Sequence, residues 1–199
     1  VLRTDIPVSA PQQIQSKAKD KYSPMSFRHF VLGAVAIFIY VGVEVGIPNT
    51  ANLYMSANPA VGPAIAGTVV GLYWLMMMFG RLLGGAIGGK VCSKAMLVAV
   101  SSLAIAMLVC VMFFPETWVV TFKGIELPVS MILMFLCGLM TSVMWGAIFN
   151  LAAEGLGKYT PAASGIFMAL VCGGGILPFF QNLLADHTNY LISYIVPIA

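Results

Sequence analysis

The chain has 199 residues, of which 60% are hydrophobic and 9% are charged, and its formal net charge is +3. Soluble globular domains carry about 25% charged residues, so this composition excludes an ordinary soluble enzyme or binding domain. We therefore expect an integral membrane protein in contact with the lipid bilayer, and we expect no nucleic-acid partner.

Five apolar runs predict membrane-spanning helices, because each reaches the ~18–20 residues that cross a bilayer core. We expect these helices over residues 28–55, 63–89, 95–114, 127–152 and 161–184. A sixth apolar run begins at Tyr190 and reaches only Ala199, which is too short to span. The expected fold class is an all-α membrane protein with five full spanning helices and the start of a sixth.

We divide the chain into two parts. Residues 1–26 are polar and basic and are expected to form a cytoplasmic loop, and residues 27–199 are expected to form one six-helix unit with a truncated last helix. Because the chain does not begin with Met and stops inside an apolar run, we expect a fragment of a longer protein or a processed chain. Basic loops favour the cytoplasm, and placing the first residues there puts nine of the ten Lys and Arg residues on that side.

The first helix carries a concentrated set of polar residues. Glu44 lies near its middle, where a charged side chain costs roughly 2.5–3.5 kcal/mol unless it faces protein or water. Pro48 is expected to kink the helix, and Asn49 and Asn52 add two amides. A carboxyl group, a kink and two amides in one membrane helix indicate a ligand site, so we expect Glu44 to bind substrate or a coupling proton.

Other helices offer further candidates. A run of three glycines followed by Pro178 predicts a broken or bent helix near the midplane, which is typical of a carrier binding site. We expect amide and aromatic side chains in the helices to bind the hydroxyls and ring face of a sugar, or else to pack the helices together. We expect Arg81 either to extend to the interface or to pair with an acid or a helix end and clamp a gate. The expected substrate-binding residues are Glu44, Asn49, Asn52, Tyr73, Trp145, Asn150, Gln181 and Asn182, and the expected gating or structural residues are Arg81, Pro48, Gly173, Gly174, Gly175 and Pro178.

Small residues recur at a spacing of four, which lets membrane helices approach closely. The pairs are Gly42 with Gly46 and Gly67 with Gly71, followed by the series Gly80, Gly84 and Gly88. The four cysteines show no CxxC spacing and are expected to be small buried side chains. The sequence contains no HExxH or GxSxG motif and no cluster of His with acids, so we expect no enzyme, no cofactor and no metal site.

Four segments carry a family resemblance. They are Tyr40-Val-Gly-Val-Glu-Val-Gly46, Gly80-Arg-Leu-Leu-Gly84, Ile148-Phe-Asn-Leu-Ala-Ala-Glu-Gly-Leu-Gly-Lys158 and Gly173-Gly-Gly-Ile-Leu-Pro178. In this order they resemble the carboxy-terminal half of the fucose permease family, which are sugar–proton symporters of the major facilitator superfamily. The resemblance covers nearly all of residues 28–199.

The resemblance implies that the chain forms helices seven to twelve of a twelve-helix carrier in a bacterial cytoplasmic (inner) membrane. It implies transport of a monosaccharide of the fucose, glucose or galactose type, with proton symport by alternating access. The missing amino-terminal six-helix half is then an expected partner, beside the sugar and the proton. Two alternatives remain: a facilitator or a carrier for another small solute, and a non-transporting membrane scaffold subunit.

Overall fold

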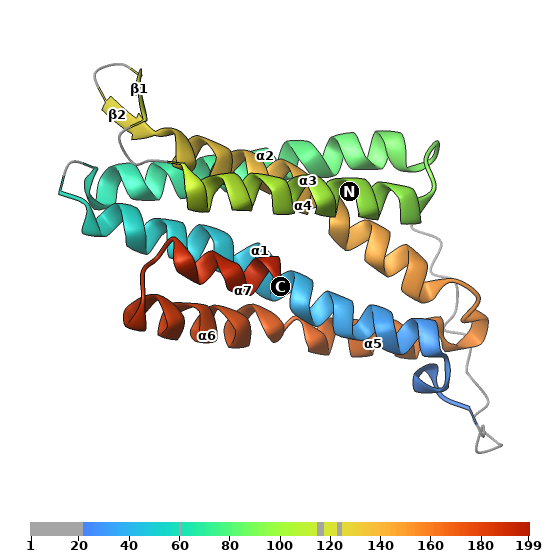
Figure 1. Cartoon of the computed structure of the whole chain (residues 1–199). Helices are drawn as coiled ribbons and strands as arrows, with labels where there is room; N and C mark the ends of the chain where they lie inside the picture. The colour runs from blue at the N-terminus through green and yellow to red at the C-terminus, as the bar shows by residue number, and fades with distance from the viewer. Residues whose placement is uncertain (1–21, 60, 115–117, 123–124) are drawn as a thin grey trace, which may run out of the picture.

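The computed structural model describes residues 22–59, 61–114, 118–122 and 125–199, and every structural statement below concerns these residues. Its long helices run roughly parallel and antiparallel to one another in one bundle (Figure 1). The helices are α1 (Arg28–Ala57), α2 (Gly62–Gly88), α3 (Ser93–Phe113), α4 (Val129–Ala153), α5 (Thr160–Leu170), α6 (Gly173–His187) and α7 (Ile195–Ile198). Short 3-10 turns lie at Pro24–Ser26, Gly157–Tyr159 and Ile192–Tyr194.

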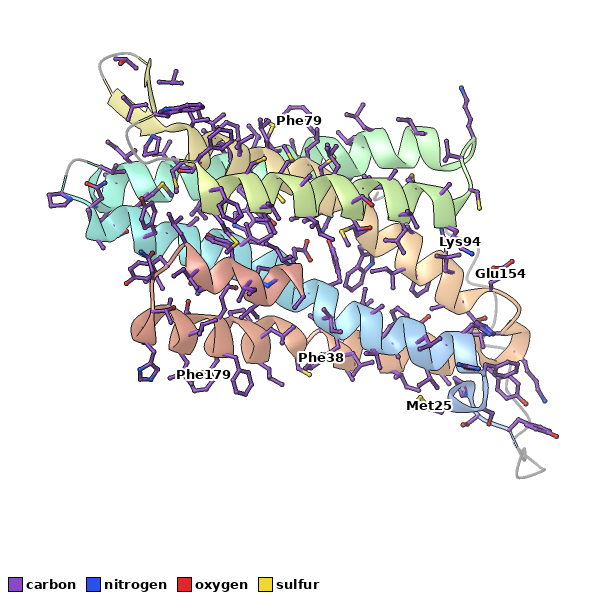
Figure 2. The ribbon with its side chains drawn as sticks, viewed as in Figure 1. Met25, Phe38, Phe79, Lys94, Glu154 and Phe179 are labelled. Carbon is purple, nitrogen blue, oxygen red and sulfur yellow. The ribbon has the colours of Figure 1, made fainter. Side chains whose placement is uncertain are left out.

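Five segments of the described chain are long and apolar enough to span a membrane, and they are the five that the sequence predicts. The fifth, Gly157–His187, contains both α5 and α6. Large apolar side chains cover the outer surface, and Figure 2 shows Phe79 and Phe179 projecting outward on opposite sides of the bundle. A surface of this kind suits lipid rather than water, so the chain is a multi-pass integral membrane protein.

Helix α1 lies at the centre of the bundle and packs against α2, α4 and α6, while α3 packs against α4 (Figure 1). Two clusters of buried side chains fill the interior. One is built around Ile47, Met77 and Met134, and the other around Phe30, Tyr40 and Ile148. The central position of α1 places Glu44 among three neighbouring helices.

Some of the glycine pairs permit close helix contact, as the sequence predicts. A Cβ atom at Gly42 would collide with Leu177 of α6, and one at Gly80 would collide with Ser142 of α4. At Gly67, Gly71 and Gly88, by contrast, no atom of the described chain lies within 4 Å of such a Cβ. The packing role predicted for these three positions is therefore not seen here.

The predicted break in the fifth spanning segment is confirmed, but it begins earlier than expected. Helix α5 ends at Leu170, and the amides of Val171 and Cys172 bond to carbonyls three residues back in a tight turn. The three glycines start α6 instead of interrupting a helix, and α6 continues through Pro178. Likewise α1 continues through Pro48 over its whole length of 30 residues.

Two further expectations were wrong. The segment expected as a loop between α3 and α4 contains an antiparallel hairpin, β1 (Val119–Phe122) and β2 (Ile125–Pro128), which the consecutive branched and aromatic residues of β1 favour. Only Cys137 of the four cysteines is buried. The other three, Cys92, Cys110 and Cys172, lie on exposed faces, where a small sulfur side chain is as compatible with lipid as it is with a protein core.

Candidate functional site

An ion pair joins the first two helices inside the bundle. Nη2 of Arg81 donates a hydrogen bond to Oε1 of Glu44 at 2.7 Å. The Glu44 side chain is 8% exposed and that of Arg81 is 55% exposed, so the acid is enclosed while the guanidinium reaches an open space. Of the two roles that the sequence left open for Arg81, the structure contains the pairing with an acid.

Tyrosine hydroxyls on α1 and α2 attach both helices to α4 beside this ion pair. The Tyr40 hydroxyl donates to the Thr141 carbonyl at 3.0 Å. The Tyr73 hydroxyl donates to the Glu44 carbonyl at 3.1 Å and lies 3.3 Å from the Thr141 hydroxyl. All three side chains are almost fully buried, so these bonds fix the backbone around Glu44. Tyr73, predicted to bind substrate, thus holds three helices together.

A cavity of about 390 Å³ lies between α2 and α4 on the exposed side of Arg81. Trp145 and Asn150 line it together with Arg81, so three of the residues singled out in the sequence meet there. The Trp145 ring contacts the ring of Tyr40, with centroids 6.2 Å apart. The cavity offers an aromatic face, an amide and a guanidinium whose charge Glu44 balances, a combination that can hold a small polar molecule.

Four other predicted site residues lie away from this cavity. Asn182 accepts a hydrogen bond from Thr50 across the α1–α6 contact, and Asn52 accepts one from Ser56 within α1. Gln181 is 2% exposed, and its Nε2 has no hydrogen-bond partner in the described chain. The fourth, Asn49, does not line the α2–α4 cavity either. In the present arrangement Asn182 joins α1 to α6, and the substrate-binding roles of the four amides remain predictions.

Three residues of the site were not predicted from the sequence: Tyr40, Thr141 and Ser142, the last of which lines the cavity. Their spacing contained the signal. Tyr40 precedes Glu44 by four residues, and Thr141 precedes Trp145 by four, so each pair shares one face of its helix. A search for polar or aromatic residues one turn from each candidate would have found them.

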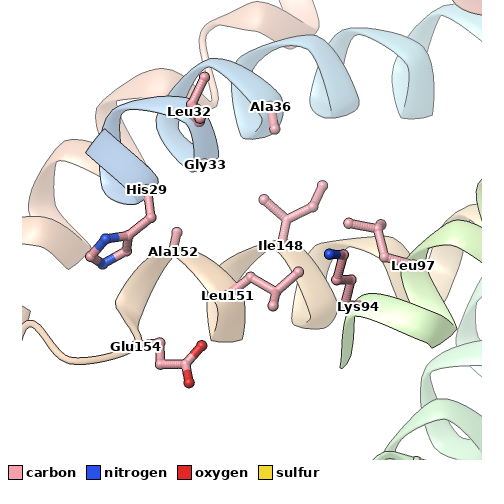
Figure 3. Close-up of a pocket in the computed structure, with 10 residues that line it drawn as sticks. All are labelled: His29, Leu32, Gly33, Ala36, Lys94, Leu97, Ile148, Leu151, Ala152 and Glu154. Carbon is pink, nitrogen blue, oxygen red and sulfur yellow. The ribbon is translucent and has the colours of Figure 1, made fainter. Parts of the chain in front are cut away.

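A second, mostly apolar groove lies between α1, α3 and α4, at the end of the bundle where α1 begins (Figure 3). Its volume is about 640 Å³, and His29, Lys94 and Glu154 are its charged or titratable lining residues. An adjoining hollow of about 350 Å³ shares Ala36, Leu97 and Ile148 with it and reaches Pro197 in α7. In the described part of the chain no three His, Cys, Asp or Glu side chains group as a metal site requires.

Comparisons with known proteins agree with this architecture. Residues 5–178 match the Major Facilitator Superfamily. A protein of Brucella abortus (strain 9-941) called glucose/galactose transporter is 32% identical over 187 residues, which are 90% of this chain and 42% of that protein. A putative glucose/galactose transporter of Helicobacter pylori (strain J99) is 28% identical over 98% of this chain and 45% of its own length.

Solved structures share the fold. The FucP transporter in its outward conformation superimposes with a TM-score of 0.79 and 21% identity, covering 92% of this chain and 44% of the solved one. A second structure, of the E. coli fucose:proton symporter, gives a TM-score of 0.76 over 87% of this chain. The chain therefore spans less than half the length of the relatives it matches, and its fold is that of half a twelve-helix carrier.

The resemblance found in the sequence is confirmed at the level of fold and superfamily. A superfamily of carriers also agrees with the expectation that the chain is not an enzyme. The match covers most of the chain. The chain belongs to the Major Facilitator Superfamily.

Proposed function

We propose that the chain is the carboxy-terminal half of a monosaccharide carrier. The observation that carries the proposal is the Glu44–Arg81 ion pair beside Trp145, at the wall of a cavity between membrane helices. Ionisable residues inside a membrane protein mark substrate and ion pathways. The names of the relatives from Brucella abortus and Helicobacter pylori supply the substrate class, glucose or galactose.

In this proposal Trp145 and Asn150 contact the sugar, and Glu44 acts through Arg81, which lines the same cavity. The aromatic face of Trp145 contacts the apolar face of the ring, and the Asn150 amide bonds its hydroxyls. The missing amino-terminal half closes the other side of the cavity, and rocking of the two halves opens the site to each side of the membrane in turn.

We propose that transport is coupled to protons through Glu44. A proton on its carboxylate removes the charge that holds Arg81 and releases the guanidinium to another partner. Proton binding and helix contact are then linked, because each state of the carboxyl group favours a different partner for Arg81. The ion pair of the present arrangement is the deprotonated state of this cycle. If the pair instead stays closed throughout the cycle, the chain belongs to a facilitator.

Orientation and domain boundaries complete the proposal. One end of the described bundle carries four basic residues, Arg28, Lys90, Lys94 and Lys158. We place this end on the cytoplasmic side of a bacterial inner membrane. Figure 2 shows Lys94 and Glu154 at this end. Residues 1–26 then belong to the cytoplasmic loop between the halves, although residues 1–21 lie outside the described chain, as does Lys123.

We also propose that α7 begins the sixth helix of the unit 27–199. The groove of Figure 3 and the adjoining hollow run from α7 to the cytoplasmic end. They offer an apolar surface against which such a helix packs. Leu97 lines the groove, so the sixth helix should cover it, whereas Val98 is exposed. In a carrier without native cysteines, Leu97→Cys should therefore resist alkylation in detergent while Val98→Cys reacts. Equal reaction at both positions contradicts the proposal.

The test of function uses the carrier formed by this chain and its amino-terminal half, reconstituted in proteoliposomes. Uptake of labelled fucose, glucose and galactose is followed with and without an inward proton gradient, for the wild type and Glu44→Gln. Gradient-driven uptake that the mutant loses, with sugar exchange retained, supports coupling through Glu44. Uptake that ignores the gradient in the wild type favours a facilitator, and no sugar uptake at all refutes the substrate class.

A further inference from the structure

Glycines form much of the wall of the α2–α4 cavity. Gly84, Gly85 and Gly88 line it from α2, and Gly146 lines it from α4. A Cβ atom at Gly84 would lie 2.9 Å from Val143, so that glycine is required by the contact between the two helices. The other three need a separate explanation.

Packing within the described chain does not explain Gly85, Gly88 or Gly146. Apart from the local helix backbone, no atom of the described residues lies within 4 Å of a Cβ built at any of the three, so alanine fits there without collision. Glycine in a helix interior is less favourable than alanine by about 1 kcal/mol in measurements made in water. The missing side chains enlarge the cavity and leave its floor as bare backbone.

The remaining lining defines what the cavity suits. The Asn150 side chain is exposed and makes no hydrogen bond to the described residues, and Trp145 is half-buried with its ring beside the cavity. The positive charge of Arg81 is already balanced by Glu44 at 2.7 Å. An aromatic face, a free amide and a compensated charge together favour a neutral polar ring over a sugar acid or a sugar phosphate.

We propose that Gly85 and Gly146 are specificity-determining positions for a neutral hexose. This inference rests on the proposed function and extends it. The two glycines leave the room in which the sugar lies against Trp145 and Asn150, and a methyl group at either position removes that room. The added methyl group then weakens binding of a six-carbon sugar, which carries a hydroxymethyl group, more than binding of a five-carbon sugar, which lacks it.

The test measures glucose and xylose uptake by the same reconstituted carrier for the wild type, Gly85→Ala and Gly146→Ala. One methylene group in a binding pocket changes discrimination by about 10-fold or more. We expect the KM for glucose to rise by about that factor in each variant, with a much smaller change for xylose. Gly71→Ala is the matched control, because it lies on the same helix, is equally open, and lines none of the described cavities.

A second measurement keeps the inference testable if an alanine variant is inactive. In a carrier without native cysteines, Gly146→Cys should react with a water-soluble maleimide, and glucose should slow the reaction more than xylose does. The inference is overturned if the ratio of the KM for glucose to the KM for xylose is unchanged in the alanine variants, or if glucose does not slow the labelling. In either case the proposed function still stands as long as the wild type takes up a monosaccharide. A wild type that transports no monosaccharide overturns both.

Discussion

The guanidinium of Arg81 on α2 lies 2.7 Å from the carboxylate of Glu44 on α1, although the two residues are 37 positions apart. The acid is enclosed by protein and the base is half exposed. The carboxylate therefore depends on this partner more than the guanidinium does.

Arg81→Gln should destabilise the protein more than the double substitution Glu44→Gln with Arg81→Gln. Removal of one partner from a buried pair costs about 3–5 kcal/mol because it leaves a charge without compensation, whereas removal of both is often neutral. Since Arg81 is half exposed, we expect the lower end of that range. Thermal unfolding of the purified protein in detergent measures both variants, and a double variant no more stable than Arg81→Gln contradicts the prediction.

Tyr73→Phe should loosen the contact among α1, α2 and α4. The substitution removes the hydrogen bond to the Glu44 carbonyl and the contact with the Thr141 hydroxyl, while the ring still fills its place. Hydrogen bonds between membrane helices are worth about 0.6 kcal/mol on average and up to about 1.7 kcal/mol. We expect a small fall in thermal stability of that order. Tyr190→Phe is the control, since the described chain gives its hydroxyl no hydrogen bond; equal effects would contradict the role of Tyr73.

Two glycines at the start of α6 make a matched pair for testing helix contact. A Cβ atom at Gly173 would collide with the Phe38 carbonyl oxygen, which is backbone of α1 and cannot turn aside, whereas one at Gly175 meets nothing within 4 Å. Overpacking of this kind costs about 1–3 kcal/mol. Gly173→Ala should therefore lower thermal stability and Gly175→Ala should not, and similar melting temperatures for the two variants would exclude a tight α1–α6 contact.

The spanning helices could be predicted from sequence because each is a long apolar run, and their ends differ from the prediction by only a few residues. Glu44 and Arg81 could also be singled out, since charges inside a membrane segment are conspicuous. Their pairing could not be predicted, because it depends on how α1 and α2 face each other. The same limit applies to Tyr73, whose aromatic ring suits a binding surface as well as a buried contact.

The glycines show a related limit. A spacing of four marks Gly42, Gly67 and Gly80 alike, yet only the first and the last of these three meet another helix in the described chain. The hairpin after α3 was missed because a short strand of four residues between two membrane helices has no hydropathy signal of its own. Tertiary neighbours, not local pattern, decide these cases.

A substitution of Gln181 tests whether this predicted site residue packs helices or binds substrate. Its side chain is 2% exposed at the α1–α6 contact, and its Oε1 would collide with a Cβ atom on Gly46. Its Nε2 has no partner in the described chain. A buried polar group without a partner costs about 1–3 kcal/mol. Gln181→Met keeps a similar shape and removes that group, so thermal stability should stay equal or rise, with monosaccharide uptake unchanged.

The neighbouring Asn182→Leu serves as the comparison, because it removes the hydrogen bond from Thr50 and should lower stability slightly. Uptake lost in Gln181→Met at unchanged melting temperature would show that the amide meets the sugar in another state of the transport cycle. In that case the contact around Gln181 must open during transport, because in the present arrangement the side chain is enclosed by protein.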